Sequence, residues 1–282
     1  MRLRFLLLFL LLMMSVVGFG QGRDTTVPQG TSIPGLGGLV GLNGAGFVEF
    51  GGSYFHLNRT NVSAPFAPWG DAYFRGLMSG GNNKFNGELT RQVHYGDIGW
   101  FYNLGWTRTW SPDWYTEISA GTSTRGFFLP KFRTDGFVNR KLLARRQLIV
   151  TGGLGYDKSK TVNTATRYTA GGTYYFEHPF VVQGGVTWTH ANPGSILARS
   201  QYLAVSQGHD KEHYITVRAE IGREGYELIG PQTSLFNFAV HNYSANWRQW
   251  LGPSWGFNMS FESENNFTYH RFGGGLGFFM DF

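Results

Sequence analysis

The stretch from Tyr269 to Phe282 constrains the fold more than any other part of the sequence. Alternate residues from Phe272 onward are apolar or glycine, and the intervening positions, which begin with Arg271, are mostly small or charged. A period of two indicates a β-strand, because successive side chains point to opposite faces. The apolar face would need a second layer in a soluble sheet, but it would face lipid in a membrane barrel. An amphipathic edge strand of a soluble sheet is the alternative at this point.

The same stretch resembles the carboxy-terminal signature of Gram-negative outer-membrane β-barrels, in which apolar residues alternate before a final phenylalanine. The resemblance implies two kinds of partner, the lipid of the outer membrane and the machinery that inserts barrels into it. The residues that would form the insertion signal are Phe272, Leu276, Phe278, Met280 and Phe282.

The composition agrees with a barrel and excludes several other classes of protein. Glycine, with 41 of 282 residues, has about twice its usual share, and aromatic residues reach 17%. A mean hydropathy of −0.22 would suggest a soluble protein, but alternating strands average out in this way. The lack of cysteine excludes disulfides, thiolate metal sites and a catalytic cysteine. The net charge is +6, but the basic residues are scattered, so no nucleic-acid partner is expected.

The amino-terminal part carries two predicted segments. Residues 1–20 contain two arginines, then an apolar run, then two glycines at the spacing of a cleavage site, which predicts a cleaved secretory signal peptide. The run is too short for a comfortable membrane span, although an uncleaved anchor is the alternative. Residues 21–46 are rich in glycine and proline and are expected to form a periplasmic extension.

Residues 47–282 alternate between strand-like segments and turn signals. A clear example is the face shared by Ile98, Trp100, Tyr102, Leu104 and Trp106. The segments are about ten residues long, which is enough to cross a bilayer when the strand is tilted. We therefore predict an all-β fold, a transmembrane antiparallel up-and-down barrel of about fourteen strands, or twelve if weak segments are fused.

The predicted connections alternate in length, as expected if periplasmic turns are short and outer loops long. Short ones include Ser111 to Asp113 and the turn at His178-Pro179. Two outer connections, near Gly96 and near Asn265, look short and break the pattern. A soluble β-sandwich would not need such strands throughout, nor tryptophans repeatedly near strand ends. The expected longer connections are Asn58–Pro68, Thr124–Arg133, Ser159–Thr166, Ala191–Ile196 and Glu224–Gln232.

Three motifs in this region are similar to the YaiO family of outer-membrane β-barrel proteins. They are FNGELTRQ at 85–92, SPDWYTEISAGTSTRGFFLPKFR at 111–133 and LIVTGGLGYDKSKTVNTATRYTAGGTYYF at 148–176. The resemblance covers most of residues 47–282 and implies an integral barrel in the outer membrane of the cell. It implies no activity, so it identifies no catalytic residues.

The sequence offers only weak candidates for chemistry. His209 and His213 are four apart with carboxylates between them, but they lie across a predicted turn, where this spacing does not converge on a metal. We therefore expect no metal, no cofactor and no enzymatic activity. Histidines that could meet a serine or aspartate only through the fold are His56, His94, His190, His241 and His270.

Charged residues on the faces opposite the apolar ones are better functional candidates. Rings of charge set ion selectivity in pores, whereas charges that pair across the lumen would seal it. A lumen of about fourteen strands is intermediate between a filled barrel and an aqueous channel. Three functions remain open: a pore for small polar solutes, a plugged barrel whose loops bind a partner, and an enzyme at the lumen mouth. The candidate lumen-lining residues are Lys84, Glu88, Asp97, Glu117, Asp157, Arg218, Glu220, Glu262 and Glu264.

Overall fold

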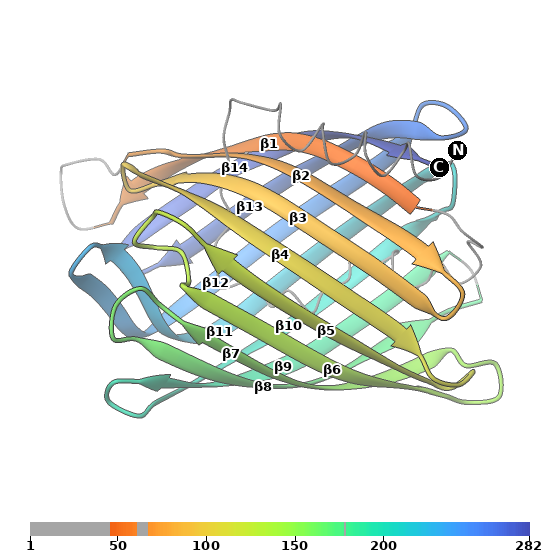
Figure 1. The fold of residues 1–282 in the computed structure, drawn as a ribbon, viewed down its shortest axis with the longest axis horizontal. Helices are drawn as coiled ribbons and strands as arrows, with labels where there is room; N and C mark the ends of the chain where they lie inside the picture. The colour runs from red at the N-terminus through yellow and green to blue at the C-terminus, as the bar shows by residue number, and fades with distance from the viewer. Residues whose placement is uncertain (1–45, 61–66, 178) are drawn as a thin grey trace.

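The computed structural model describes residues 46–60, 67–177 and 179–282, and these residues form a closed barrel of fourteen antiparallel strands (Figure 1). The predicted signal peptide, nearly all of the predicted extension and His178 lie outside the described residues. Within the described ranges, no helix is long and apolar enough to cross a membrane.

Each strand pairs with the next one along the chain, and β1 pairs with β14 to close the barrel. This result confirms the predicted all-β up-and-down topology and the strand number of fourteen rather than twelve. The strands are β1 (Gly46–Arg59), β2 (Trp69–Gly80), β3 (Asn83–His94), β4 (Asp97–Thr109), β5 (Trp114–Ser123), β6 (Phe132–Leu142), β7 (Leu148–Lys158), β8 (Thr164–Tyr175), β9 (Phe180–Asn192), β10 (Ile196–His209), β11 (His213–Gly230), β12 (Thr233–Trp250), β13 (Trp255–Asn266) and β14 (Tyr269–Asp281).

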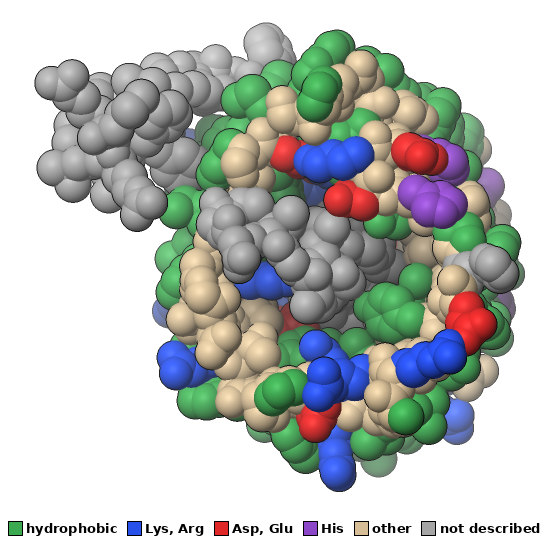
Figure 2. Space-filling model, turned by 90° about the vertical axis from the view of Figure 1, so that its right-hand side faces the viewer, with side chains coloured by type: hydrophobic (Ala, Val, Ile, Leu, Met, Phe, Trp, Pro, Cys, Tyr) green, Lys and Arg blue, Asp and Glu red, His purple; other side chains and the backbone are tan. Residues whose placement is uncertain are grey.

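The two ends of the barrel differ, and we name them by the chain. The backbone of Gly46, at the start of β1, donates a 2.9 Å hydrogen bond to that of Phe282. We call this end the terminal end, and the opposite end, which carries the connection from β1 to β2, the far end. Figure 2 views the terminal end, where basic, acidic, histidine and apolar side chains surround a hollow.

The side chains are distributed in the opposite way to those of a soluble protein. Large apolar side chains on the outer surface are exposed, for example Leu104 at 72% and Phe50 at 59%. Charged side chains on the alternate face are buried, for example Glu49 at 0% and Arg271 at 2%. Apolar surface in water costs roughly 25 cal/mol per Å², so a lipid environment is the one that stabilises this arrangement.

Glycines are needed where the barrel closes. Gly51 on β1 pairs directly with Gly277 on β14, and the hydroxyl of Tyr73 lies over both glycines, where a Cβ on either would overlap it. The same hydroxyl donates a 2.8 Å hydrogen bond to Glu49. The two glycines therefore let an aromatic side chain reach a buried carboxylate across the seam.

We expect Gly277→Ala to lower the free energy of unfolding by about 1–3 kcal/mol, because the Tyr73 ring must move away from Glu49. Chemical unfolding in detergent micelles, followed by tryptophan fluorescence, measures this change. Gly152→Ala is the matched control, since a Cβ added there meets nothing within 4 Å. Equal effects of the two substitutions would contradict the packing argument.

One predicted loop is wrong. Glu224–Gln232 was expected to be irregular, but β11 continues to Gly230 and β12 begins at Thr233, and each strand has 18 residues. Only Pro231 and Gln232 form the tight turn of this long hairpin, and Gly225 and Gly230 lie within β11. The expected connection from Ala191 to Ile196 is also shorter than predicted, because β9 ends at Asn192 and β10 begins at Ile196, so the expected contrast in connection length holds only in part.

Candidate functional site

A network of buried charges lines the inside of the barrel where it closes. Glu49 on β1 accepts hydrogen bonds from Arg75 on β2 at 2.7 Å and from Asn258 on β13 at 2.6 Å. Arg248 on β12 approaches the other side of the carboxylate at 3.5 Å. Four strands thus converge on one acid, which the sequence analysis did not single out.

A second network lies on the wall formed by β6, β7 and β8. Asp135 accepts from Arg133 at 2.8 Å and from Arg167 at 2.9 Å. Arg167 also forms an ion pair with Asp157, one of the candidate lumen residues. Opposite charges alternate here along neighbouring strands, so each buried charge has a partner.

The third network, on β13 and β14, contains two of the candidate lumen residues, Glu262 and Glu264. Arg271 bonds to Glu264 at 2.7 Å and also to Glu262. Asn242 on β12 donates to Glu262 at 3.0 Å. Glu264 is buried, whereas Glu262 is half-buried and is the more accessible of the two.

Three other candidates also have partners. Arg218 bonds to Glu220 at 2.7 Å, and its guanidinium lies 3.7 Å from the centre of the Tyr202 ring. Glu117 accepts a 3.1 Å hydrogen bond from Asn139.

The three remaining candidates lie on β3 and at the start of β4. Lys84 is half-buried two strands away from Glu117, through the Thr107 position of β4. Glu88 accepts a 2.8 Å hydrogen bond from the Thr90 hydroxyl. Asp97 lies at the far end, where it accepts a 2.9 Å bond from the backbone of Phe127. Asp97 therefore holds a connection rather than joining the three charge networks.

The β11–β12 hairpin closes much of the far end. Beyond Gly222, β11 no longer pairs with β10, and beyond Val240, β12 no longer pairs with β13, so the tip of the hairpin pairs only with itself. Gly225 in the tip lies against Thr189 and Ala191 on the inner face of β9. The tip therefore bends over the lumen instead of standing away from it.

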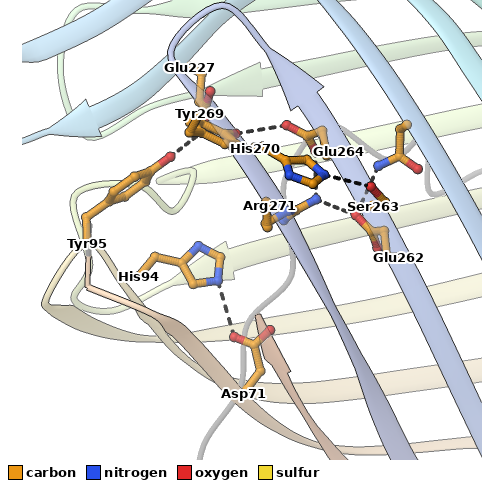
Figure 3. A network of polar contacts seen from close by, with 11 residues as sticks. Asp71, His94, Tyr95, Glu227, Glu262, Ser263, Glu264, Tyr269, His270 and Arg271 are labelled. Atoms are coloured by element: carbon orange, nitrogen blue, oxygen red, sulfur yellow. Dashed lines mark hydrogen bonds and ion pairs between the residues drawn. The ribbon is translucent and has the colours of Figure 1, made fainter. Parts of the chain in front are cut away.

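Glu227 fastens this tip to the opposite wall. Its carboxylate accepts hydrogen bonds from Tyr95, at the β3–β4 turn, at 2.6 Å and from Tyr269 on β14 at 2.8 Å (Figure 3). The neighbouring residue, Tyr226, contacts another part of the barrel wall, where its hydroxyl donates a 3.2 Å hydrogen bond to Asp157 on β7. Because β3 and β11 lie on opposite sides of the barrel, these contacts span the far-end mouth.

An aromatic stack fills the space beside the hairpin tip. Trp69 stacks on His94 at 3.9 Å between ring centres, and His94 stacks on Phe128 at 4.5 Å. The Nε2 atom of His94 lies 3.2 Å from the carboxylate of Asp71 (Figure 3). Phe128 comes from the β5–β6 connection, which is the second element that covers the mouth.

Lys160 holds that connection from the β7–β8 side. Its ammonium donates to the backbone carbonyls of Arg125 at 2.5 Å and of Gly126 at 2.8 Å. Burial lowers the pKa of Lys160 to about 8, although the charge of Asp97 acts in the opposite direction. The folded protein therefore holds this proton less tightly than the unfolded chain, whose lysine pKa is about 10.5.

We expect the wild-type protein to gain stability relative to Lys160→Met as pH rises from about 8 to about 10.5. In this window the unfolded chain binds the extra proton, so the free energy of unfolding increases with pH, while the penalty is fully present below pH 8. Denaturant midpoints of both proteins across the window measure the difference. Parallel curves would contradict the expectation.

Several residues of these networks escaped the sequence analysis. Glu227 fell in a predicted loop, and Arg75, Asp135 and Arg167 were not considered. Their positions on the polar face of each strand could have identified them, because the period of two is as clear there as for the candidates. The contact between Glu227 and Tyr95 has no local signal, since 132 residues separate them.

Comparisons with solved structures support the architecture. The toluene transporter TodX from Pseudomonas putida superposes with a TM-score of 0.63 at 7% identity, covering 93% of this chain and 95% of that one. The CymD monoaromatic hydrocarbon channel gives 0.58 at 6% identity, with 86% and 89% covered. An outer-membrane channel from Pseudomonas putida F1 gives 0.55 at 8% identity, with 85% and 96% covered. At these identities the likeness shows a shared fold alone.

Comparison with sequences is more specific. No curated protein matches the chain. The family model described as the YaiO membrane beta barrel domain matches residues 51–227, which is more than half of the chain and extends from β1 into the β11–β12 hairpin. The chain therefore belongs to the YaiO family of membrane β-barrels.

Proposed function

We propose that this protein is an outer-membrane channel for small polar solutes, and that its far-end mouth is closed in the state described here. The observation that carries the proposal is the buried lining of charges, which includes Glu49, Asp135 and Arg271 and in which the partners lie on the same or nearby strands of the wall rather than across the lumen. Such a lining suits hydrated, polar molecules better than hydrocarbons. TodX and CymD are named for aromatic hydrocarbons, so the proposed solutes differ from theirs.

The proposal includes an orientation and a route to the membrane. The terminal end faces the periplasm, and the far end, with the hairpin tip, faces the exterior. Residues 1–20 direct export and are removed, and the final strand is recognised by the insertion machinery. The side chains of that signal lie on the outer surface, where Phe278 is 44% exposed and Met280 54% exposed.

Single-channel recording tests the proposal with protein purified from outer membranes and inserted into planar bilayers. We expect rare openings, because the mouth is closed. Glu262→Gln should shift the reversal potential in a salt gradient toward anion selectivity, because it leaves the lumen more positive. Glu177→Gln is the control, since Glu177 is exposed in the β8–β9 connection. An inserted but silent protein would favour the alternative, a plugged barrel that acts through its outer surface.

A further inference from the structure

A serine and a histidine meet on the outer surface of the barrel, away from the lumen. The Oγ atom of Ser263 on β13 lies 3.1 Å from Nε2 of His270 on β14 (Figure 3). The residues on either side of Ser263, Glu262 and Glu264, contribute to the internal charge network. Because side chains alternate along a strand, Ser263 and His270 face outward. Neither residue has a part in the lumen or in its closure.

Two amide side chains flank this histidine in the sheet. His270 pairs with Asn58 on β1 to one side and with Asn265 on β13 to the other. The Oδ1 atom of Asn58 lies 2.9 Å from Nε2 of His56. A serine nucleophile needs a base within hydrogen-bond reach, and it benefits from groups that orient the base and donate to an oxyanion. Amide side chains can orient the base or donate a hydrogen bond to the oxyanion.

The pair lies at the depth at which a membrane ester would be found. His270 is the second residue of β14, close to the far-end turn at 267–268. The next outward residue toward the membrane centre is Phe272, whose ring is 44% exposed and lies 5.6 Å from that of His270. Toward the terminal end, the outward face continues with apolar residues such as Phe261. The site is thus at the border between the apolar band and the polar interface, where lipid headgroups join their acyl chains.

We propose that Ser263 and His270 form an esterase site that cleaves carboxylic esters of amphiphiles in the outer leaflet of the membrane. Ser263 Oγ attacks the ester carbonyl carbon while His270 Nε2 takes its proton. The carbon–oxygen ester bond then breaks, and the leaving alcohol receives that proton. Water, deprotonated by the same imidazole, next attacks the acyl-serine, releases the carboxylic acid and restores the hydroxyl. Asn265 lies across from His270, where its amide can donate to the oxyanion of each tetrahedral intermediate.

A fluorophosphonate probe, which reacts covalently with activated serines, tests the site without knowledge of the natural ester. We expect the purified protein in detergent to be labelled at Ser263, as peptide mass spectrometry would show. Ser263→Ala should abolish labelling, and His270→Gln should slow it at least 100-fold. Ser260→Ala is the matched control, since Ser260 lies on the same strand but faces the lumen.

A second assay connects labelling with turnover. Hydrolysis of p-nitrophenyl butyrate and of phosphatidylcholine vesicles should follow the same order among the variants. Asn265→Ala should lower kcat and leave KM little changed, as expected for an oxyanion donor. Each variant must still migrate faster in unheated than in boiled detergent gels, which shows that the barrel is folded. A folded wild type that takes no probe at Ser263 and cleaves neither ester faster than Ser263→Ala would overturn the proposal, whatever the channel recordings give.

Discussion

Glu227→Ala is expected to open the far-end mouth and raise the ratio of open to closed channels about 100-fold. A hydrogen bond to a charged group contributes about 1.5–3 kcal/mol, and Glu227 accepts two, from Tyr95 at the β3–β4 turn and from Tyr269 on β14. Losing both weakens the closed state by about 3 kcal/mol, and each 1.4 kcal/mol corresponds to a factor of ten. The Tyr269 hydroxyl keeps the carboxylate of Glu264 at 2.9 Å, and the Tyr95 hydroxyl can bond to water in an open mouth. Open probability in planar bilayers measures the change.

Conservative variants distinguish the loss of the hydrogen bonds that hold the hairpin tip from a general disturbance of the hairpin. Tyr95→Phe and Tyr269→Phe each remove one donor while keeping the ring, so each should raise the open-to-closed ratio by about tenfold. Glu212→Ala is the control, because Glu212 lies in an exposed turn at the terminal end. If Glu227→Ala left the open probability unchanged, the hairpin tip would not be the barrier, and the aromatic stack around His94 would become the stronger candidate.

The fold could be predicted because lipid outside and polar groups inside impose the same period of two on every strand. In β3, Lys84 and Glu88 were assigned to one face from the sequence, and they lie on the face that also carries the buried Gln92. The same alternation gave the strand number, since each turn interrupts it. These are local properties, and each can be read within about ten residues.

Sequence reasoning failed where the outcome depended on residues far apart. The hairpin tip looked like a loop because its glycines and proline weaken the alternation, and its fastening by Tyr95 is a contact between opposite walls. Ser263 and His270 are close in sequence, but their contact depends on the register between β13 and β14, which no single strand reveals. From the sequence, His270 was only one of several histidines that could meet a serine through the fold.

Glu49 should contribute more to stability than any other single side chain of the networks, because it is fully buried and accepts from groups on three other strands. Glu49→Leu leaves the charges of Arg75 and Arg248 without this carboxylate inside the barrel. Removing one partner of a buried ion pair costs about 3–5 kcal/mol. We expect a loss of this size in the free energy of unfolding, measured with urea in lipid vesicles.

A double-mutant cycle distinguishes loss of charge pairing from loss of packing. Adding Arg75→Met to Glu49→Leu removes one of the two unbalanced guanidinium groups, and the other, Arg248, keeps Asp281 at 3.3 Å. The double variant should therefore be more stable than Glu49→Leu alone, because an apolar pair can replace a buried ion pair at little cost. If the two losses simply added, Glu49 would stabilise the seam through its shape and through Tyr73 and Asn258 rather than through charge. In that case ion selectivity rather than stability would explain why an acid lies at the seam. Glu49→Leu should then shift the reversal potential.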